Sequence, residues 1–231
     1  AGSSYAAMNN SWGVSSVSQI NFGGAIGTKW ARIPSTSSIA SSVQTAFDNA
    51  ASDTVIVFSN GNEGWNSSTG RVYYYNSSSD ASNMTNSQGY SGVTVNTAST
   101  YGSLPQTKTS LNGKWLTVVA LDSSNNIASY SNGCGSIAKT WCIAAPGSSI
   151  YSTVDLDDST ESGSYASYNG TSMAAPSVTG VASLVLSYFP KISANRLKEI
   201  ILESGLEVNF HVNHDEKNIL FEDLSRSGKI V

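Results

Sequence analysis

The sequence has few charged residues. Asp, Glu, Lys and Arg make up only 12% of the chain, which is about half of the roughly 25% that is usual in soluble proteins. The net charge is −4 and the isoelectric point is about 5.1. This weakly acidic, polar composition gives no support for nucleic acid or an anionic membrane surface as a partner, because both depend on clustered Lys and Arg.

Long apolar runs and an initiator methionine are also missing. No apolar stretch reaches the about 18 residues that a membrane helix needs, so we expect no membrane span in this chain. The first residue is Ala1, and no signal peptide opens the sequence. We therefore expect residue 1 to be a point inside a longer protein. The 231 residues are enough for one domain with a sizeable core.

Cysteine is scarce as well. The two cysteines, Cys134 and Cys142, have seven residues between them, a spacing that suits a short disulfide-closed loop in an oxidising compartment. Two reduced, buried thiols are the alternative. No histidine or further cysteine lies near them, which argues against a metal site. We expect the disulfide, and with it an extracytoplasmic location.

Helical and strand patterns alternate along the chain. Residues 38–51 carry apolar side chains at helical intervals, with Ser37 or Ser38 as the expected N-cap. Residues 54–58 (TVIVF) and 115–121 (WLTVVAL) are apolar runs of strand length, typical of strands buried on both faces of a parallel sheet. Helix followed by buried strand indicates βαβ units and an α/β fold.

The other expected elements are shorter or less regular. Residues 172–188 predict a helix that is apolar almost all round and therefore central and buried, with Pro176 in its first turn. Residues 195–204 predict an amphipathic helix that ends at Gly205. We expect a polar loop over residues 65–100 and an irregular tail over 206–231. Short strands are expected at residues 6–12, 127–130, 141–144 and 218–221.

The stretch 169–180, NGTSMAAPSVTG, carries the strongest chemical signal. It places Ser172 between a Gly-Thr turn and a run of small residues that begins a helix. The small residues leave room for a substrate backbone, and the helix N-terminus offers free N–H groups to a developing oxyanion. Ser172 is therefore a candidate nucleophile.

A second candidate site follows the buried strand 54–58. Residues 59–64 read SNGNEG, and ligands of α/β sheets bind where strands end. The glycines permit a tight loop, and Asn62 offers an amide N–H₂ donor. An ordinary Asn-Gly turn is the alternative when the segment is taken alone.

Both segments resemble the subtilisin-like serine proteases, the subtilase family. NGTSMAAP is similar to the family's nucleophile motif, SNGNEG to its Gly-Asn turn, and MNNSWG (residues 8–13) to its substrate-binding strand. The resemblance covers roughly residues 6–205 and implies a three-layer fold with a parallel sheet. Within the family, LPQTKTSLNGKWLTVVALD and the two cysteines are most similar to autotransporter subtilases, whereas FEDLSRSGKIV looks more like subtilases of Bacteroidetes-type bacteria.

The resemblance also implies residue roles. Ser172 is the nucleophile, and Asn62 with the backbone N–H of Ser172 forms the oxyanion hole. The primary specificity pocket is lined on one side by Ser11, Trp12 and Gly13, and on the other by Ser59, Asn60 and Gly61. The edge at residues 8–13 binds an extended peptide through main-chain hydrogen bonds. For Trp12, an ordinary core aromatic is an equal alternative.

Two of the three subtilase triad motifs, those of the Asp and the His, are missing from the sequence. The family's Asp-Thr-Gly or Asp-Ser-Gly turn and its His-Gly-Thr-His motif belong upstream of MNNSWG, and neither is present. The only histidines, His211 and His214, lie in the polar tail, where we expect solvated surface residues. Because both motifs are absent, we expect the fold of this chain to be incomplete. Because a serine hydroxyl needs an adjacent base, we also expect little peptidase activity from the chain alone.

Three functions are compatible with these patterns. The first is a serine endopeptidase acting on peptides or proteins, with the missing N-terminal part of the same domain as its partner. The second is a catalytically dead subtilase-like module that binds peptides or a partner chain. The third is a carbohydrate-binding surface built from Trp65, Tyr73, Tyr74, Tyr75 and Tyr90. We expect no cofactor.

A metal site is not expected either. Asp155, Asp157 and Asp158 form a dense acidic group just before the nucleophile motif. Such spacing suits a hard cation like Ca²⁺, but an ordinary solvated acidic loop explains it more simply.

Overall fold

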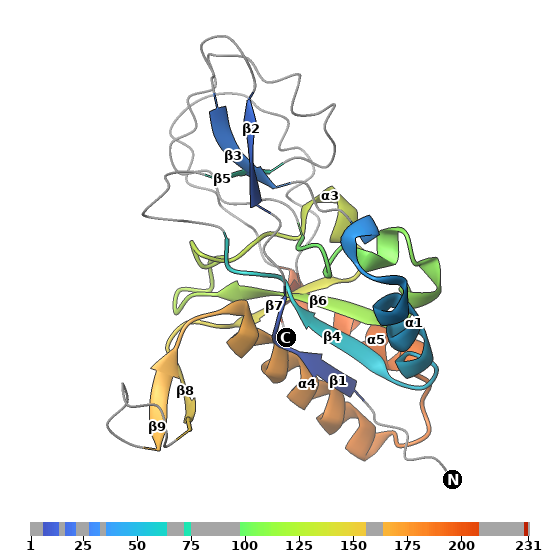
Figure 1. Cartoon of the computed structure of the whole chain (residues 1–231). Coiled ribbons are helices and arrows are strands. Elements are labelled where there is room, and N and C mark those ends of the chain that lie inside the picture. Colours follow the sequence, from blue (N-terminus) through green and yellow to red (C-terminus); the bar gives the residue numbers. More distant parts are fainter. Residues whose placement is uncertain are drawn as a thin grey trace.

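A parallel sheet forms the centre of the fold (Figure 1). The computed structural model describes residues 7–13, 17–21, 28–32, 36–63, 72–74, 98–155, 164–207 and 229–230. The main sheet has the order β1 (Ala7–Asn10), β4 (Val55–Ser59), β6 (Trp115–Leu121), β7 (Cys142–Pro146), β11 (Lys229–Ile230) and β10 (Leu206–Glu207). Only the β10–β11 pair is antiparallel within this sheet. The α/β class expected from the sequence is confirmed.

Strands β4 and β6 are buried on both faces, as their apolar runs predict. Along β4, Ile56 and Phe58 belong to the hydrophobic cluster on one face, whereas Val55 and Val57 belong to the cluster on the other. Successive side chains of a strand point to opposite faces, so a strand covered on both sides is apolar at nearly every position. The buried Ser59 and Thr117 are the exceptions in β4 and β6. The sheet is thus the middle of three layers.

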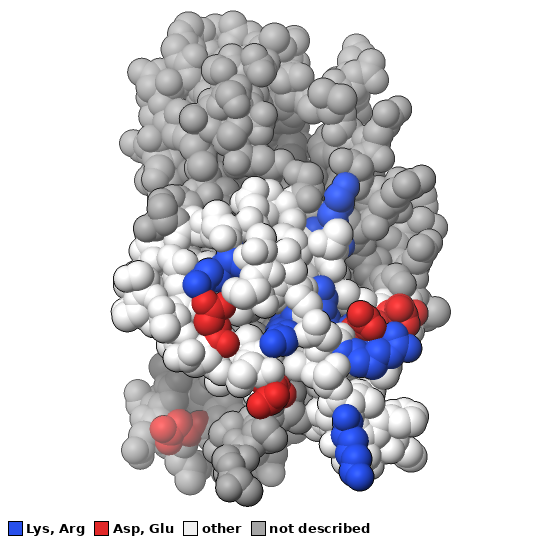
Figure 2. Space-filling model, turned by 90° about the vertical axis from the view of Figure 1, so that its right-hand side faces the viewer, with Lys and Arg blue, Asp and Glu red and all other residues white. Residues whose placement is uncertain are grey.

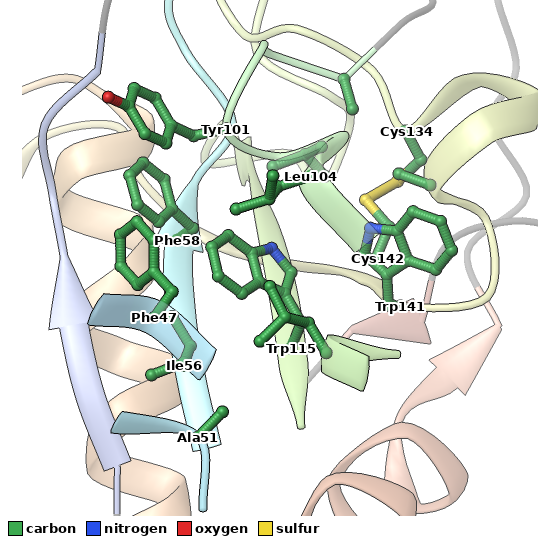
Figure 3. Close-up of a cluster of buried hydrophobic side chains, with 14 of the residues drawn as sticks. Phe47, Ala51, Ile56, Phe58, Tyr101, Leu104, Trp115, Cys134, Trp141 and Cys142 are labelled. Atoms are coloured by element: carbon green, nitrogen blue, oxygen red, sulfur yellow. A yellow bond between two sulfur atoms is a disulfide. The ribbon is translucent and has the colours of Figure 1, made fainter. Parts of the chain in front are cut away.

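An aromatic cluster fills the first face (Figure 3). Phe47 of helix α1 (Ser41–Ala50) packs edge-on against Phe58 and Trp115, and the rings of Phe58 and Trp115 are stacked 5.5 Å apart. The disulfide between Cys134 and Cys142 is present at one end of this cluster. It ties the short helix α3 (Gly135–Ala138) to the start of β7.

Two helices cover the second face. Helix α4 (Thr171–Tyr188) lies on β1, β4, β6 and β7, and helix α5 (Ala194–Ser204) packs beside it. Small residues of α4 face the sheet, which lets the helix approach closely: Ala174, Ala175, Val178 and Ala182. The expected burial all round is wrong on the outer face, because no described element covers it and Leu184 and Tyr188 are 64% and 81% exposed.

The remaining described elements are small. They are β2 (Val17–Asn21), β3 (Thr28–Arg32) and β5 (Val72–Tyr74) in one sheet, the hairpin β8 (Ile150–Thr153) and β9 (Tyr165–Tyr168), and the 3₁₀ turns η1 (Thr36–Ser38), η2 (Leu104–Gln106) and η3 (Thr109–Leu111). Strand β5 falls inside the expected loop 65–100, and β10 and β11 fall inside the expected irregular tail. The expected strand at 218–221 lies outside the described residues.

Three local expectations are wrong. Helix α1 is capped by Ala40 without a side-chain bond, because residues 36–38 are already taken up by η1. Residues 127–130 form no strand: Ile127 makes one isolated bridge to Leu121, after which the chain turns. Pro176 is the sixth residue of α4 and therefore lies beyond its first turn.

The surface carries few charges. On the side of the molecule shown in Figure 2, the Lys, Arg, Asp and Glu side chains of the described residues are sparse and of mixed sign. Among the described residues, no helix is both long and apolar enough to cross a membrane.

Candidate active site

Asn62 and the start of α4 meet where β4 ends. The backbone N–H and the hydroxyl of Thr171 both donate to Asn62 Oδ1, at 2.8 and 2.9 Å. The N–H of Gly61 donates in turn to the Thr171 hydroxyl at 3.0 Å. Because the amide oxygen of Asn62 holds two donors, its N–H₂ group is the part that is left to face an incoming oxygen atom.

Ser172 is the second residue of α4 and is half-buried. Its Oγ donates to the carbonyl of Ser11 at 3.1 Å, and the Ser11 hydroxyl donates to the carbonyl of Ser172 at 2.8 Å. Its N–H lies in the first turn of the helix, where the helix itself supplies no acceptor. The hydroxyl of Ser172, its N–H and the Asn62 amide thus gather at one helix N-terminus, which favours negative charge.

A network of buried amides holds the loop after β4. Asn60 is fully buried, and its Nδ2 donates to the carbonyls of Asn132 and Gly133 at 3.1 and 2.7 Å. Asn132 Nδ2 donates back to Asn60 O at 2.8 Å and to Glu63 Oε2 at 2.6 Å, while Glu63 N donates to Asn132 Oδ1 at 3.2 Å. The loop that carries Asn62 is therefore fixed from both sides.

Gly61 is required at its position in this loop. Its backbone φ is +96°, a value that residues with a side chain rarely adopt. A Cβ there would lie 2.5 Å from Glu63 Oε2 and 2.6 Å from Asn132 Nδ2. Any other residue would displace the network that positions Asn62.

The expected substrate strand lies beside the nucleophile. Ser11 contacts Ser172 directly, as described above, and a Cβ on Gly13 would meet no atom within 4 Å. Trp12 is 49% exposed, and one side of its ring rests on Tyr101 and Phe58, with ring centroids 4.9 and 5.2 Å apart. Trp12 thus packs on the aromatic cluster with one side of its ring and leaves about half of its surface exposed.

The other side of the expected pocket, Ser59, Asn60 and Gly61, is largely buried. Ser59 and Asn60 are buried, and the Asn60 side chain is bound inside the protein, where Asn60 Oδ1 also accepts from the N–H of Ser99 at 2.9 Å. Gly61 is half-buried. Of the three residues expected on this side, only Gly61 has more than a minor exposed surface.

The described residues bring no general base to Ser172. They include no histidine, since His211 and His214 both lie outside them. The described part of the chain also holds no group of three or more His, Cys, Asp or Glu that would bind a metal ion. Asp155 is described and exposed, whereas Asp157 and Asp158 lie outside the described residues. The side chains proposed for sugar stacking are likewise not described.

Sequence reasoning missed three residues that support the site. Thr171, which orients Asn62, stands next to the nucleophile inside NGTSMAAP, so its place in the motif was the available signal. Asn132 and Glu63 lie 69 residues apart in the sequence. Nothing local marks that pair as partners, although Asn132 is a polar residue in a segment otherwise rich in buried side chains.

Comparisons with known proteins point to one family. A family model described as the subtilase family matches residues 4–220. An extracellular serine protease of Serratia marcescens is 34% identical over 122 residues, which are 46% of this chain and 12% of that protein. Subtilisin DY of Bacillus licheniformis is 42% identical over 83 residues, which are 36% of this chain and 27% of that protein.

Solved structures give the same fold. The prenylagaramide maturation protease PagA superposes with a TM-score of 0.53 at 19% identity, over 96% of this chain and 57% of that chain. A mutant form of the protease domain of PatA gives 0.52 at 20% identity, over 87% and 52%. The chain thus spans little more than half the length of these structures, and its matches to the two relatives above span about a quarter of their length or less.

Proposed function

The chain belongs to the subtilase family, and from that premise we propose that the protein is a serine endopeptidase in which Ser172 attacks the peptide carbonyl. Asn62 and the N–H of Ser172 stabilise the oxyanion that forms. The observation that carries this proposal is the double donation of Thr171 to Asn62 Oδ1. A module that only binds peptides has no need for an amide N–H₂ held free beside a helix N-terminus.

The substrate is an extended peptide that pairs with residues 11–13, the part of the expected substrate-binding segment 8–13 that lies beyond the end of β1. Main-chain hydrogen bonds supply most of the affinity in such strand addition, so many sequences are accepted. Ser11, Trp12 and Gly13 line one side of the primary pocket, and Ser59, Asn60 and Gly61 the other. Because the Asn60 side chain is engaged internally, that second side acts through Gly61 and the loop backbone.

The chain carries only the nucleophile half of the site. The missing base belongs to an N-terminal part of the same domain, which also covers two surfaces left open in the described residues: the free edge of β1 and the exposed outer face of α4. Residues 1–231 alone are then inactive and poorly soluble. A fluorophosphonate probe that labels Ser172 rapidly in the isolated chain would contradict this point.

The alternative is a catalytically dead module that binds peptides or a partner chain. It keeps the strand at residues 8–13 and needs neither Asn62 nor Ser172. The two functions differ in how the whole protein responds to substitutions at these positions. The disulfide and the extracellular relative support an extracytoplasmic location for either one.

The test uses peptide hydrolysis by the whole protein. Ser172→Ala should abolish turnover, and Asn62→Leu should lower kcat by about 10²–10³, the range measured for such a donor in subtilisin itself rather than a value taken from this structure. Asn126→Ala, which truncates an exposed amide in a turn, is the matched control and should leave kcat unchanged. If the whole protein binds peptides but no variant changes hydrolysis, the binding module is correct.

A further inference from the structure

Helix α4 lacks one of its own hydrogen bonds at the nucleophile. Pro176 lies inside the helix and has no backbone N–H. The carbonyl four residues earlier belongs to Ser172, so that carbonyl receives no helix hydrogen bond from Pro176. The Ser11 hydroxyl donates to this same carbonyl at 2.8 Å. A side chain from the end of β1 thus takes the place of the missing helix donor.

The polarity of this contact is fixed by a second bond. Asn9 Nδ2 donates to Ser11 Oγ at 2.9 Å. Since the Ser11 oxygen already accepts from Asn9, its own hydrogen is left for the carbonyl of Ser172, which can only accept. Asn9 and Ser11 are two residues apart, which places both side chains on the same side of an extended strand.

We propose that Ser11 is a positioning residue for the nucleophile: its hydroxyl, oriented by Asn9, replaces the helix hydrogen bond that Pro176 cannot make. The catalytic part of this inference rests on the proposed function. The first turn of α4 is then fixed to the strand expected to bind substrate. Ser172 Oγ makes the second bond, to Ser11 O at 3.1 Å, so the same residue holds both the backbone and the hydroxyl of Ser172.

Positioning of this kind acts on kcat more than on KM. A nucleophile displaced by about 1 Å loses up to about 10²-fold in rate, whereas main-chain pairing with a peptide does not need the Ser11 hydroxyl. A purely structural role for Ser11 would instead lower stability and leave the kcat of the folded enzyme unchanged.

The test is a double-mutant cycle in the whole protein. Ser11→Ala should raise the unfolding equilibrium constant about tenfold, because the Ser172 carbonyl loses its partner. Pro176→Ala supplies an N–H to that carbonyl, so adding Ser11→Ala to Pro176→Ala should raise the constant by less than about threefold. Ser183→Ala, which removes an exposed hydroxyl from the same helix, is the matched control and should show no coupling to Pro176.

The kinetic arm follows hydrolysis of a peptide substrate by the same variants. Ser11→Ala should lower kcat about tenfold and change KM less than about twofold, and Pro176→Ala should restore most of the loss. An equal effect of Ser11→Ala with and without Pro176 would overturn the replacement of the helix bond. Coupling in unfolding with an unchanged kcat would overturn the positioning role.

The two proposals fail in different ways. If the unsubstituted whole protein hydrolyses no peptide, the proposed function is wrong and the kinetic part of this inference falls with it. The unfolding cycle still decides whether Ser11 completes α4.

Discussion

Replacing Asn132 with alanine should disable the oxyanion loop without touching either proposed catalytic residue. Asn132 is fully buried and makes three side-chain hydrogen bonds, to Asn60 O, Glu63 Oε2 and Glu63 N. These bonds clamp the loop on both sides of Asn62. The substitution removes these three bonds and weakens the clamp. The backbone bond from Asn132 N–H to Gly61 O at 3.0 Å and the bonds from Asn60 Nδ2 remain.

The expected cost in stability follows from those bonds. Each contributes about 1 kcal/mol, and the carbonyl of Asn60 and the N–H of Glu63 also lose the partner that the side chain supplied. Asn132→Ala should therefore lower the free energy of unfolding by about 3 kcal/mol. If the loop then shifts Asn62 by about 1 Å, kcat should fall up to about 10²-fold.

Urea unfolding and peptide hydrolysis by the whole protein measure the two effects. Asn126→Ala is the matched control, because it removes an exposed amide from a nearby turn, and it should change neither quantity. A stability loss below about 1 kcal/mol would show that water replaces the Asn132 amide without cost. A loss of about 3 kcal/mol in the free energy of unfolding with an unchanged kcat would show that these bonds do not position Asn62.

Three further predictions concern the frame around the site. Replacing Cys134 and Cys142 together by alanine should lower the free energy of unfolding by about 2.5 kcal/mol, the loop-closure value for a sequence separation of 8, and dithiothreitol should then have no further effect in urea unfolding. Gly147→Ala should lower it by about 1–3 kcal/mol, because a Cβ there lies 2.5 Å from Ala120 Cβ and 2.8 Å from Gly170 O, whereas Gly180→Ala, with open space around it, should raise it by about 0.5–1 kcal/mol. The hydrogen bond from Lys108, and to a smaller extent the one from Ser110, lowers the pKa of the Asp48 carboxyl below its ordinary value of 3.8. This pair therefore stabilises the folded state above pH 3.8 and loses its effect as the pH falls through the lowered pKa. The stability difference between Asp48→Asn and the parent protein should accordingly vanish in acid, and a difference that persists there would contradict the assignment.

The central strands and the amphipathic helix could be predicted from the sequence because they depend on local patterns of apolar residues. The apolar runs at residues 54–58 and 115–121 are buried on both faces, and a sheet covered by helices on both sides requires such runs. The amphipathic pattern at residues 195–204 predicted α5 nearly to the residue. Failures came where tertiary contacts decide, as in the isolated bridge at Ile127.

The site was predictable only in part, for the same reason. Motifs identified Ser172 and Asn62 as candidates, because each motif is a continuous segment. The bond from Thr171 to Asn62 spans 109 residues, and the bonds between Ser11 and Ser172 span 161. Such contacts depend on how the sheet brings β1, β4 and α4 together, and no periodicity encodes them. Pro176 is a partial exception, since a proline at this point leaves one carbonyl in need of a donor from elsewhere.

Helix α4 shows how a prediction that is wrong for the described structure still carries information. Its apolar residues run almost all round, yet only the face with small side chains is buried here, while Leu184 and Tyr188 are exposed. A helix at the surface of a finished domain places polar residues on its outer side. Large apolar residues on that side are explained if the helix is central in the whole protein. The β1 edge next to α4 is free among the described strands, and an additional strand there would continue the sheet under the same helix. The end of β1 lies beside Ser172 through the Ser11 contact, whereas Leu184 and Tyr188 lie 12 and 16 residues farther along α4. If one further part of the protein covers both surfaces, it therefore extends from Ser172 along the length of α4.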